Sequence, residues 1–247
     1  MKRVLSGKTA IVTGASSGIG AAIARDLRQA GVRVAGGARR IERLETDVRL
    51  ELDVTDAQSC ARFVEAALAE LGGLDVLVNN AGLALGREPF DASTEADEET
   101  VLETNVHGLI RMTRLCLPHI RDGGHIVNMG SIAGIWAYPN GALYCTSKFA
   151  VEGFTRALRE DLLGRPIRVT NIAPGMVGET EFSNVRFRGD DEQARGVYEN
   201  VPFGGALGPD DVAECVLFAL TRPLHVNVDE IVVMALAQSS GARILKV

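Results

Sequence analysis

A tyrosine and a lysine spaced four residues apart are the pair in this sequence best suited to chemistry. Tyr144 and Lys148 lie in a segment whose apolar residues recur at helical spacing, so both side chains are expected on one face of a helix. Those apolar residues are Val151, Phe154, Leu158 and Leu162. Of the four lysines in the chain, Lys148 is the one that does not lie near an end of the sequence. The alternative interpretation is a surface cation beside a buried aromatic ring.

This pair suits proton transfer at a carbon–oxygen centre. A free tyrosine has a pKa near ~10, and an ammonium about 4 Å away at an effective dielectric of about 20 contributes about 4 kcal/mol. That interaction predicts a phenol pKa of about 7, where a general acid–base catalyst works best. The lysine also has donors that can hold a ribose hydroxyl. The pair therefore indicates alcohol oxidation or carbonyl reduction, which requires a hydride carrier.

The composition is that of a globular protein with a large core. Apolar residues make up 46% of the 247 residues, and α/β chains of this length commonly form one domain. The net charge of −6 argues against a nucleic-acid-binding protein, and no apolar run approaches the ~20 residues of a membrane span. The sequence shows no signal-peptide pattern and no C-x-x-C spacing. The histidines lack metal-ligand spacing, so we expect a cytoplasmic protein without a metal site.

Strand and helix patterns alternate along the chain. Short apolar segments predict strands at residues 8–13, 32–35, 48–52, 75–79, 125–129, 168–173 and 229–234. Amphipathic segments predict helices at residues 21–31, 55–71, 94–120, 144–164 and 210–220, the second of which begins with a Thr55–Gln58 capping box. The acidic residues at 95–99 suit the solvent-exposed start of the third helix. This alternation predicts one α/β domain, residues 1–247, with a parallel sheet covered by helices on both faces.

Two segments depart from the alternation. Between the second and third strands, residues 38–47 leave room for barely two helical turns, so the crossover helix is expected to be truncated. Residues 177–207 are rich in glycine and charge and show no long period. Loops of this length in compact domains are usually functional, so we predict a substrate lid at about 177–207.

Glycines follow the first predicted strand, at the edge of the sheet where α/β proteins bind ligands. The spacing of Gly14, Gly18 and Gly20 permits a tight turn and the close approach of a pyrophosphate to a helix N-terminus. The alternative is a turn with a purely structural role.

Two arginines follow the second predicted strand, where the ribose of a dinucleotide is recognised. An NAD site has a carboxylate there, about 20 residues after the glycines. This chain has Arg39 and Arg40 instead, and no acidic residue before Glu42. Because guanidinium groups suit a 2′-phosphate, we predict NADP as the cofactor. The alternative is a pair of solvated loop arginines.

These motifs occur together in an order that resembles the short-chain dehydrogenase/reductase superfamily. The matching residues are Thr13-Gly14-x-x-x-Gly18-Ile19-Gly20, Asn79-Asn80-Ala81-Gly82, Asn105, Ser131, Tyr144-x-x-x-Lys148 and Pro174-Gly175. The resemblance covers essentially the whole chain. It implies a single-domain, doubly wound Rossmann-type sheet and a nicotinamide cofactor.

The resemblance also implies a role for each matching residue. Tyr144 is expected to be the acid–base catalyst, Lys148 its activator and ribose anchor, and Ser131 the hydroxyl that polarises the substrate carbonyl. Asn105 is expected to bend its helix and to hold a water in a proton relay to Lys148. Further cofactor contacts are expected from Gly14, Ser16, Ser17, Gly18, Ile19, Gly20, Arg39, Arg40, Asp53, Val54, Asn80, Ala81, Gly82, Pro174 and Val177.

Residues 80–86 and 180–191 narrow the resemblance to NADP-dependent 3-hydroxy acid dehydrogenases, also called serine or allo-threonine dehydrogenases. The implied reaction interconverts a small 3-hydroxy acid, such as serine, allo-threonine or 3-hydroxyisobutyrate, with its keto or semialdehyde form. The implied assembly is a homotetramer that pairs the long helices carrying Asn105 and Tyr144. Two alternatives remain: the same chemistry on a sugar, polyol or hydrophobic carbonyl, and a non-catalytic dinucleotide-binding subunit.

A substrate carboxylate needs a charged partner in a site that excludes water. Arg186 lies in the predicted lid, within the run that resembles the hydroxy acid subgroup, so we predict that it binds the carboxylate. Arg188 is expected to point the same way if the segment is extended. The alternative for Arg186 is a solvated charge on a mobile loop. Trp136 and Tyr138 are expected either to line the substrate pocket or to serve only in packing.

Overall fold

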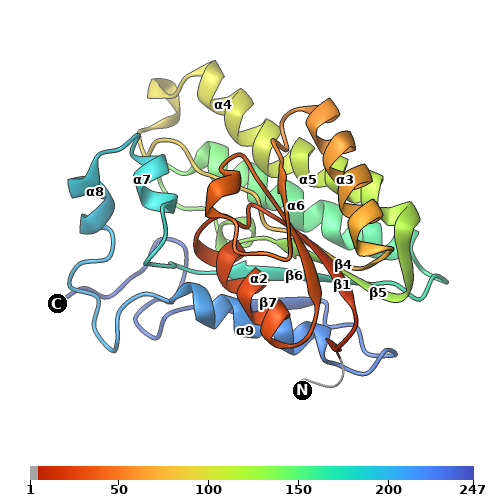
Figure 1. Cartoon of the computed structure of the whole chain (residues 1–247). Coiled ribbons are helices and arrows are strands. Elements are labelled where there is room, and N and C mark those ends of the chain that lie inside the picture. The colour runs from red at the N-terminus through yellow and green to blue at the C-terminus, as the bar shows by residue number, and fades with distance from the viewer. Residues whose placement is uncertain (1–4) are drawn as a thin grey trace.

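The computed structural model describes residues 5–247, which form one seven-stranded sheet (Figure 1). The strands are β1 (Thr9–Thr13), β2 (Arg33–Ala38), β3 (Val48–Glu51), β4 (Leu74–Asn79), β5 (Ile120–Met129), β6 (Arg168–Pro174) and β7 (Glu230–Val233). Their order is β3-β2-β1-β4-β5-β6-β7, and every neighbouring pair is parallel. The predicted doubly wound α/β fold is confirmed. The strand order reverses between β1 and β4, which is where such sheets open a ligand crevice.

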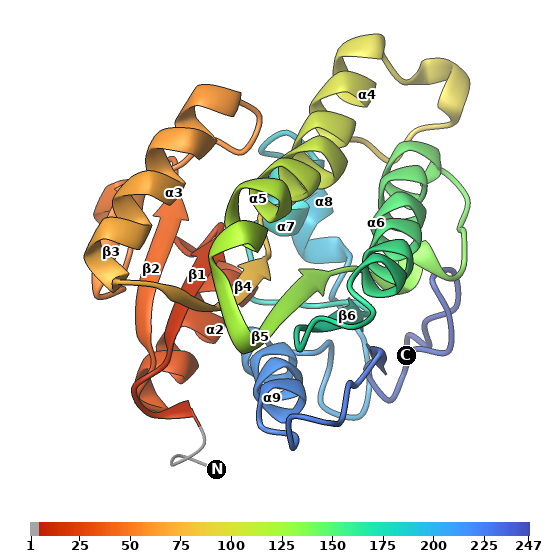
Figure 2. The same cartoon turned by 90° about the vertical axis from the view of Figure 1, so that its right-hand side faces the viewer.

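Helices cover both faces of the sheet, as Figures 1 and 2 show. One face carries α3 (Ala57–Leu71), α5 (Gly108–Cys116) and α6 (Ala142–Asp161), and the other carries α2 (Gly18–Gln29) and α9 (Pro209–Leu220). Successive residues of β1 alternate between the two cores: Ile11 packs with the α3 side, whereas Ala10 and Val12 pack with the α2 side. Strands buried on both faces explain the continuous apolar runs in the sequence.

Strand β2 extends beyond its predicted end because two glycines continue it. Side chains of neighbouring elements leave no room for a Cβ at either position: it would lie 2.7 Å from Thr46 at Gly36 and 2.6 Å from Phe63 at Gly37. The strand therefore reaches Ala38, and the two arginines follow it directly. After it, the crossover contains only a 3₁₀ turn, Ile41–Arg43, which agrees with the predicted truncation.

The start of α3 differs from the prediction. Asp56, and not Thr55, caps the helix, because the Asp56 carboxylate accepts a 2.8 Å hydrogen bond from the backbone N–H of Gln58. The Thr55 hydroxyl instead donates to Asp53 Oδ1 at 2.7 Å. The predicted Thr55–Gln58 capping box is therefore wrong by one residue.

The long helix predicted at 94–120 is built from α4 (Glu95–Leu102), a π-helical turn (Glu103–His107) and α5. Thr94 caps it by accepting from the Asp97 N–H. The acidic start is less exposed than predicted, because Asp97 is buried and accepts a 2.7 Å hydrogen bond from Arg188. This ion pair joins α4 to residues 177–207, hereafter the lid segment.

The lid segment contains two short helices, α7 (Phe182–Arg186) and α8 (Asp191–Gly196). The last residues of the chain pack against it: the Val247 N–H donates to Asn200 O at 2.9 Å, and Lys246 Nζ donates to Gly196 O at 2.7 Å. Within residues 5–247, no helix is both long and apolar enough to cross a membrane.

Candidate active site

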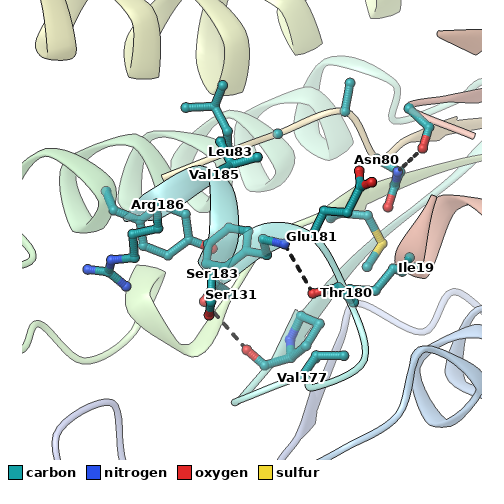
Figure 3. Close-up of a pocket in the computed structure, with 18 of the residues that line it drawn as sticks. Ile19, Asn80, Leu83, Ser131, Val177, Thr180, Glu181, Ser183, Val185 and Arg186 are labelled. Atoms are coloured by element: carbon teal, nitrogen blue, oxygen red, sulfur yellow. Dashed lines mark hydrogen bonds between the residues drawn. The ribbon is translucent and has the colours of Figure 1, made fainter. Parts of the chain in front are cut away.

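A pocket of about 390 Å³ opens at the carboxyl ends of the strands (Figure 3). Each residue predicted to contact cofactor or substrate lines it, whereas Asn105 lies behind its wall. Figure 3 shows two residues of the lid segment at opposite ends: Glu181 lies on the side of Ile19 and Asn80, and Arg186 lies on the far side of Ser131. The pocket therefore has one end at the glycine-rich turn and another at the predicted substrate site.

Tyr144 and Lys148 come from the first two turns of α6. The Lys148 ammonium is buried and donates a 2.8 Å hydrogen bond to Met129 O, at the end of β5. Its Nζ lies 5.7 Å from the centroid of the Tyr144 ring. Burial lowers the pKa of Lys148 to about 8, because the charged form loses its hydration. The two groups are close, as predicted, but the hydrogen bond of the Lys148 ammonium goes to the carbonyl of Met129 and not to Tyr144.

The electrostatics of Tyr144 differ from the prediction. Burial raises the pKa of Tyr144 above its usual value, and the neighbouring Tyr138 raises it further. A hydrogen bond with Ser131 and the charge of Arg186 oppose this effect only in part. The prediction that Lys148 lowers the pKa of Tyr144 to about 7 is therefore wrong for the protein without a bound ligand, because desolvation is the largest effect and raises this pKa.

Ser131 follows β5 and caps a 3₁₀ turn, Ile132–Gly134. Its Oγ accepts from the Ala133 N–H at 3.1 Å and donates to Pro174 O at 3.4 Å. These contacts fix the hydroxyl between the ends of β5 and β6. Ser131, Tyr144 and Lys148 thus converge on one wall of the pocket.

Asn105 lies in the π-helical turn that interrupts its helix. Its side chain accepts from the Leu83 N–H and donates to Leu83 O, both at 2.8 Å, and also donates to Ser147 Oγ at 3.0 Å. Asn105 therefore joins the loop after β4 to α6. A Cβ on Gly82 would lie 3.2 Å from Asn105 Oδ1 and 3.7 Å from Lys148 Nζ, so the glycine keeps this region open.

The turn after β1 depends on its glycines. Gly14 and Gly18 have positive φ values of 66° and 51°. At Gly20, a Cβ would lie 2.2 Å from Gly14 O and 2.4 Å from Asn80 Nδ2. Asn80 holds this arrangement by donating from Nδ2 to Thr13 O at 2.9 Å. The turn leads into the N-terminus of α2, whose backbone N–H groups suit a phosphate.

The two arginines after β2 have different surroundings. Arg40 donates from both terminal nitrogens to the carboxylate of Glu181, and its Nη2 also lies 3.4 Å from Ser17 Oγ. Arg43 donates to the same carboxylate at 2.8 Å. Arg39 is exposed and forms no hydrogen bond or ion pair with the residues that the structure describes. Sequence reasoning missed Glu181, because 141 positions separate it from Arg40.

Arg186 and Arg188 point to different places, contrary to the prediction. The Arg186 guanidinium lies over two aromatic rings, 5.5 Å from the Tyr138 centroid and 6.0 Å from the Tyr144 centroid, and donates to Gly86 O at 3.0 Å. Arg188 forms ion pairs with Asp97 and Glu88. The extended geometry assumed for this segment is wrong, since Arg186 ends helix α7 and Arg188 has a φ of 53°.

Aromatic residues lie around Arg186 at one end of the pocket. Tyr138 lines the pocket, and its buried hydroxyl has no hydrogen-bond partner within residues 5–247. Phe182 packs edge-on against Tyr144, with ring centroids 5.5 Å apart. Trp136 is 41% exposed and does not line the pocket, although its carbonyl lies against Gly241. The C-terminal contribution, from Gln238, Gly241 and Ile244, gave no signal in the sequence.

Comparisons with known proteins agree with this geometry. The family model for short chain dehydrogenase matches residues 8–191, and the chain belongs to this family. It is 44% identical over 239 residues to the NADP-dependent 3-hydroxy acid dehydrogenase YdfG of Salmonella typhi, covering 93% of this chain and 95% of the relative. It is 39% identical over 257 residues to the NADP-dependent 3-hydroxy acid dehydrogenase of Schizosaccharomyces pombe, covering 98% of both.

Solved structures give the same result. The closed form of serine dehydrogenase complexed with NADP⁺ superposes with a TM-score of 0.90 at 42% identity, covering 96% of this chain and 98% of that chain. Serine dehydrogenase from Escherichia coli superposes with a TM-score of 0.79 at 38% identity, covering 94% and 99%. The predicted superfamily is confirmed.

Proposed function

We propose that the protein is an NADP-dependent oxidoreductase that interconverts a small 3-hydroxy acid and its keto or semialdehyde form. One observation carries the proposal: the Arg186 guanidinium lies 6.0 Å from the ring of Tyr144, in the pocket that also contains Ser131 and Lys148. A hydroxyl group and a carboxylate only two carbon–carbon bonds apart can reach this tyrosine and this arginine together. The names of the relatives support the same substrate class.

The residues present fit a dinucleotide. The glycine-rich turn leads into the N-terminus of α2, and Gly20 allows the helix to approach the Gly14 carbonyl closely, an arrangement that suits a pyrophosphate. All of these residues line the pocket, and we assign Arg39 and Arg40 to the 2′-phosphate, Asp53 and Val54 to the adenine, and Pro174 and Val177 to the nicotinamide. When bound, NADP supplies the hydride acceptor or, in reduced form, the hydride donor.

The protein side chains then handle the substrate and its proton. Ser131 Oγ and the Tyr144 hydroxyl hold the substrate oxygen. Because burial raises the pKa of Tyr144, the phenol is protonated at neutral pH and donates its proton to that oxygen during carbonyl reduction. Alcohol oxidation uses the deprotonated form: the Tyr144 phenolate, which the Lys148 ammonium stabilises, accepts the proton of the substrate hydroxyl. Asn105 holds the loop after β4 against α6 so that these groups keep their spacing.

Arg186 is proposed to bind the substrate carboxylate. Among residues 5–247 no carboxylate forms an ion pair with it, although carboxylates pair with Arg40, Arg43 and Arg188. Cation–π contacts with Tyr138 and Tyr144 hold the guanidinium group beside the ring of the catalytic tyrosine. The charge is therefore available to an anionic ligand that enters the pocket.

The substitution Arg186→Ala tests this assignment. We expect kcat/KM for serine or 3-hydroxyisobutyrate to fall by about 2–4 kcal/mol in transition-state stabilisation, because a desolvated carboxylate loses its partner. Neutral alcohols of the same size should change much less. Arg195→Ala is the matched control, since it removes the same charge from an exposed position of the lid segment. Equal losses for acidic and neutral substrates would contradict the carboxylate role.

A substrate screen tests the reaction class. Formation of NADPH at alkaline pH should be fastest with serine, allo-threonine or 3-hydroxyisobutyrate. Faster turnover of sugars, polyols or hydrophobic secondary alcohols would favour the same mechanism on a different substrate. Absence of turnover combined with tight NADPH binding would favour a non-catalytic dinucleotide-binding subunit.

We also propose that the protein is a cytoplasmic homotetramer. Exposed large apolar side chains include Phe149 on α6, Phe218 on α9 and Val232 on β7. Such surfaces are typical of subunit contacts. The four cysteines form no disulfide, which suits a reducing compartment. Light scattering should give a mass about four times the 26.3 kDa of one chain, and a monomeric mass would contradict the assembly.

A further inference from the structure

The start of the lid segment, residues 177–182, crosses the glycine-rich turn like a strap, and we use that name for it. At its base, Val177 pairs with Leu207, and the Gly178 N–H donates to Leu207 O at 2.8 Å. In its middle, Thr180 packs on the turn, so that a Cβ on Gly18 would lie 3.1 Å from Thr180 Cγ2. The strap therefore covers the part of the pocket that suits a pyrophosphate.

The far end of the strap is held by Glu181. Its carboxylate accepts hydrogen bonds from Arg40, which precedes the 3₁₀ turn of the shortened crossover, and from Arg43, which is the last residue of that turn. Residues three apart on such a turn lie on one side, so both guanidinium groups reach one acceptor. Hydrogen bonds from Arg40 lower the pKa of Glu181 to about 2, so the carboxylate stays charged at neutral pH. The short 3₁₀ turn therefore brings Arg40 and Arg43 to one acceptor, whereas a full-length crossover helix would not have to place these two side chains together.

We propose that Glu181 is a positioning residue that latches the strap over the bound dinucleotide. The proposal rests on the NADP site proposed above and adds how the cofactor is retained. The base of the strap is fixed to Leu207 and its far end is held beside the end of β2. The middle of a bound dinucleotide therefore cannot leave the groove until the contacts of Glu181 with Arg40 and Arg43 break. The latch acts on the backbone that covers the pyrophosphate, so it slows the release of NADPH and of NADH alike.

The substitution Glu181→Gln tests the latch, with the dissociation rates of NADPH and NADH measured by stopped-flow displacement. The ion pairs are partly exposed, with 43% of the Glu181 side chain accessible, so their contribution is modest. We expect both cofactors to dissociate about 3- to 10-fold faster. Glu179→Gln is the matched control, because it removes the same charge from an exposed strap residue that forms no ion pair within residues 5–247. Its rates should match the wild type.

A second variant separates the latch from recognition of the 2′-phosphate. Arg43→Gln removes one latch contact without altering either arginine assigned to the phosphate. It should accelerate the release of both cofactors, as Glu181→Gln does. The double variant should release them little faster than Glu181→Gln alone, because that substitution already weakens the contact between Glu181 and Arg43.

A measurement without cofactor distinguishes failure of the latch from failure of the proposed function. In Glu181→Gln the backbone amides of residues 178–182 should exchange hydrogen faster than in the wild type and in Glu179→Gln. Unchanged exchange and unchanged release rates would overturn the latch. Slower release of NADPH with unchanged NADH would also overturn it, because Glu181 would then compete with the 2′-phosphate for Arg40. Absence of any NADPH binding by the wild type would instead overturn the cofactor site.

Discussion

At the scale of single residues, the protein places two titratable groups under strong desolvation. Tyr144 and Lys148 share one wall of the pocket, and burial favours the neutral form of each. It raises the pKa of the Tyr144 phenol and lowers the pKa of the Lys148 ammonium to about 8. Simple Coulomb reasoning from the sequence considered only the attraction between them. The extent of desolvation depends on the folded site and cannot be obtained from the sequence. The four-residue spacing therefore predicted correctly that the two side chains lie close together, but it predicted the direction of the Tyr144 pKa shift incorrectly.

The first residue-scale prediction concerns the tyrosine hydroxyl. Tyr144→Phe keeps the ring that packs against Phe182 and removes only the proton donor. We expect steady-state activity to fall by at least ~10²-fold, in line with the usual contribution of general acid–base catalysis. Circular dichroism and NADPH binding should remain close to the wild type. A fully active Tyr144→Phe enzyme would contradict the mechanism.

The second residue-scale prediction concerns the lysine and pH. Lys148→Met should be inactive and yet more stable at pH 7, because it removes a buried charge whose pKa falls from 10.5 to about 8. Between these pH values the unfolded wild-type chain holds a proton that the native protein releases, so the wild type gains stability as pH rises. The advantage of Lys148→Met should therefore shrink from pH 8 to pH 10. Thermal denaturation should show a gain of about 2–4 °C per kcal/mol.

At the scale of elements, the sequence predicted the strands and long helices well because their apolar periods are local. The truncated crossover could also be predicted, since too few residues separate β2 from β3. The lid segment could not: α7 and α8 are short, and they are held by partners far along the chain, such as Asp97 for Arg188 and Arg40 for Glu181. The order of motifs located the pocket, while the contacts that cover it exist only in the folded chain.

The element-scale prediction concerns the turn between β1 and α2. Gly20→Ala places a Cβ against the carbonyl of Gly14, a contact that the backbone must relieve by moving. We expect a loss of about 1–3 kcal/mol in stability and a marked loss of NADPH affinity, measured by chemical denaturation and by fluorescence titration. Gly196→Ala in α8 is the control, because nothing lies within 4 Å of its added Cβ. Equal behaviour of the two variants would contradict the importance of the close approach.

At the scale of the whole molecule, the lid segment is attached to three separate parts of the chain. Arg188 joins it to α4, Glu181 joins it to the end of β2, and Lys246 joins it to the C-terminal residues. These contacts are polar and partly exposed, so each is individually weak. Together they hold the lid segment in one defined place over the pocket.

The whole-molecule prediction concerns the attachment at α4. Arg188→Gln removes the ion pair with Asp97 and with Glu88 and should increase cleavage of the lid segment by chymotrypsin, which cuts after residues such as Phe187 and Tyr198. The global stability should change by less than about 1 kcal/mol, because the pair is partly exposed. Arg195→Ala should leave the cleavage rate unchanged. If Arg188→Gln is cut no faster than the wild type, α4 does not restrain the lid segment.

The position of Trp136 has an optical consequence. It is the single tryptophan of the chain, and it lies two residues before Tyr138, which lines the pocket. Indole emission overlaps the absorption band of reduced nicotinamide, so energy transfer from Trp136 should report binding of NADPH without any label. Because the backbone of Trp136 touches the C-terminal segment at Gly241, the same emission should also respond when that segment moves. The single tryptophan is thus a built-in reporter of both cofactor occupancy and movement of the C-terminal segment beside the pocket.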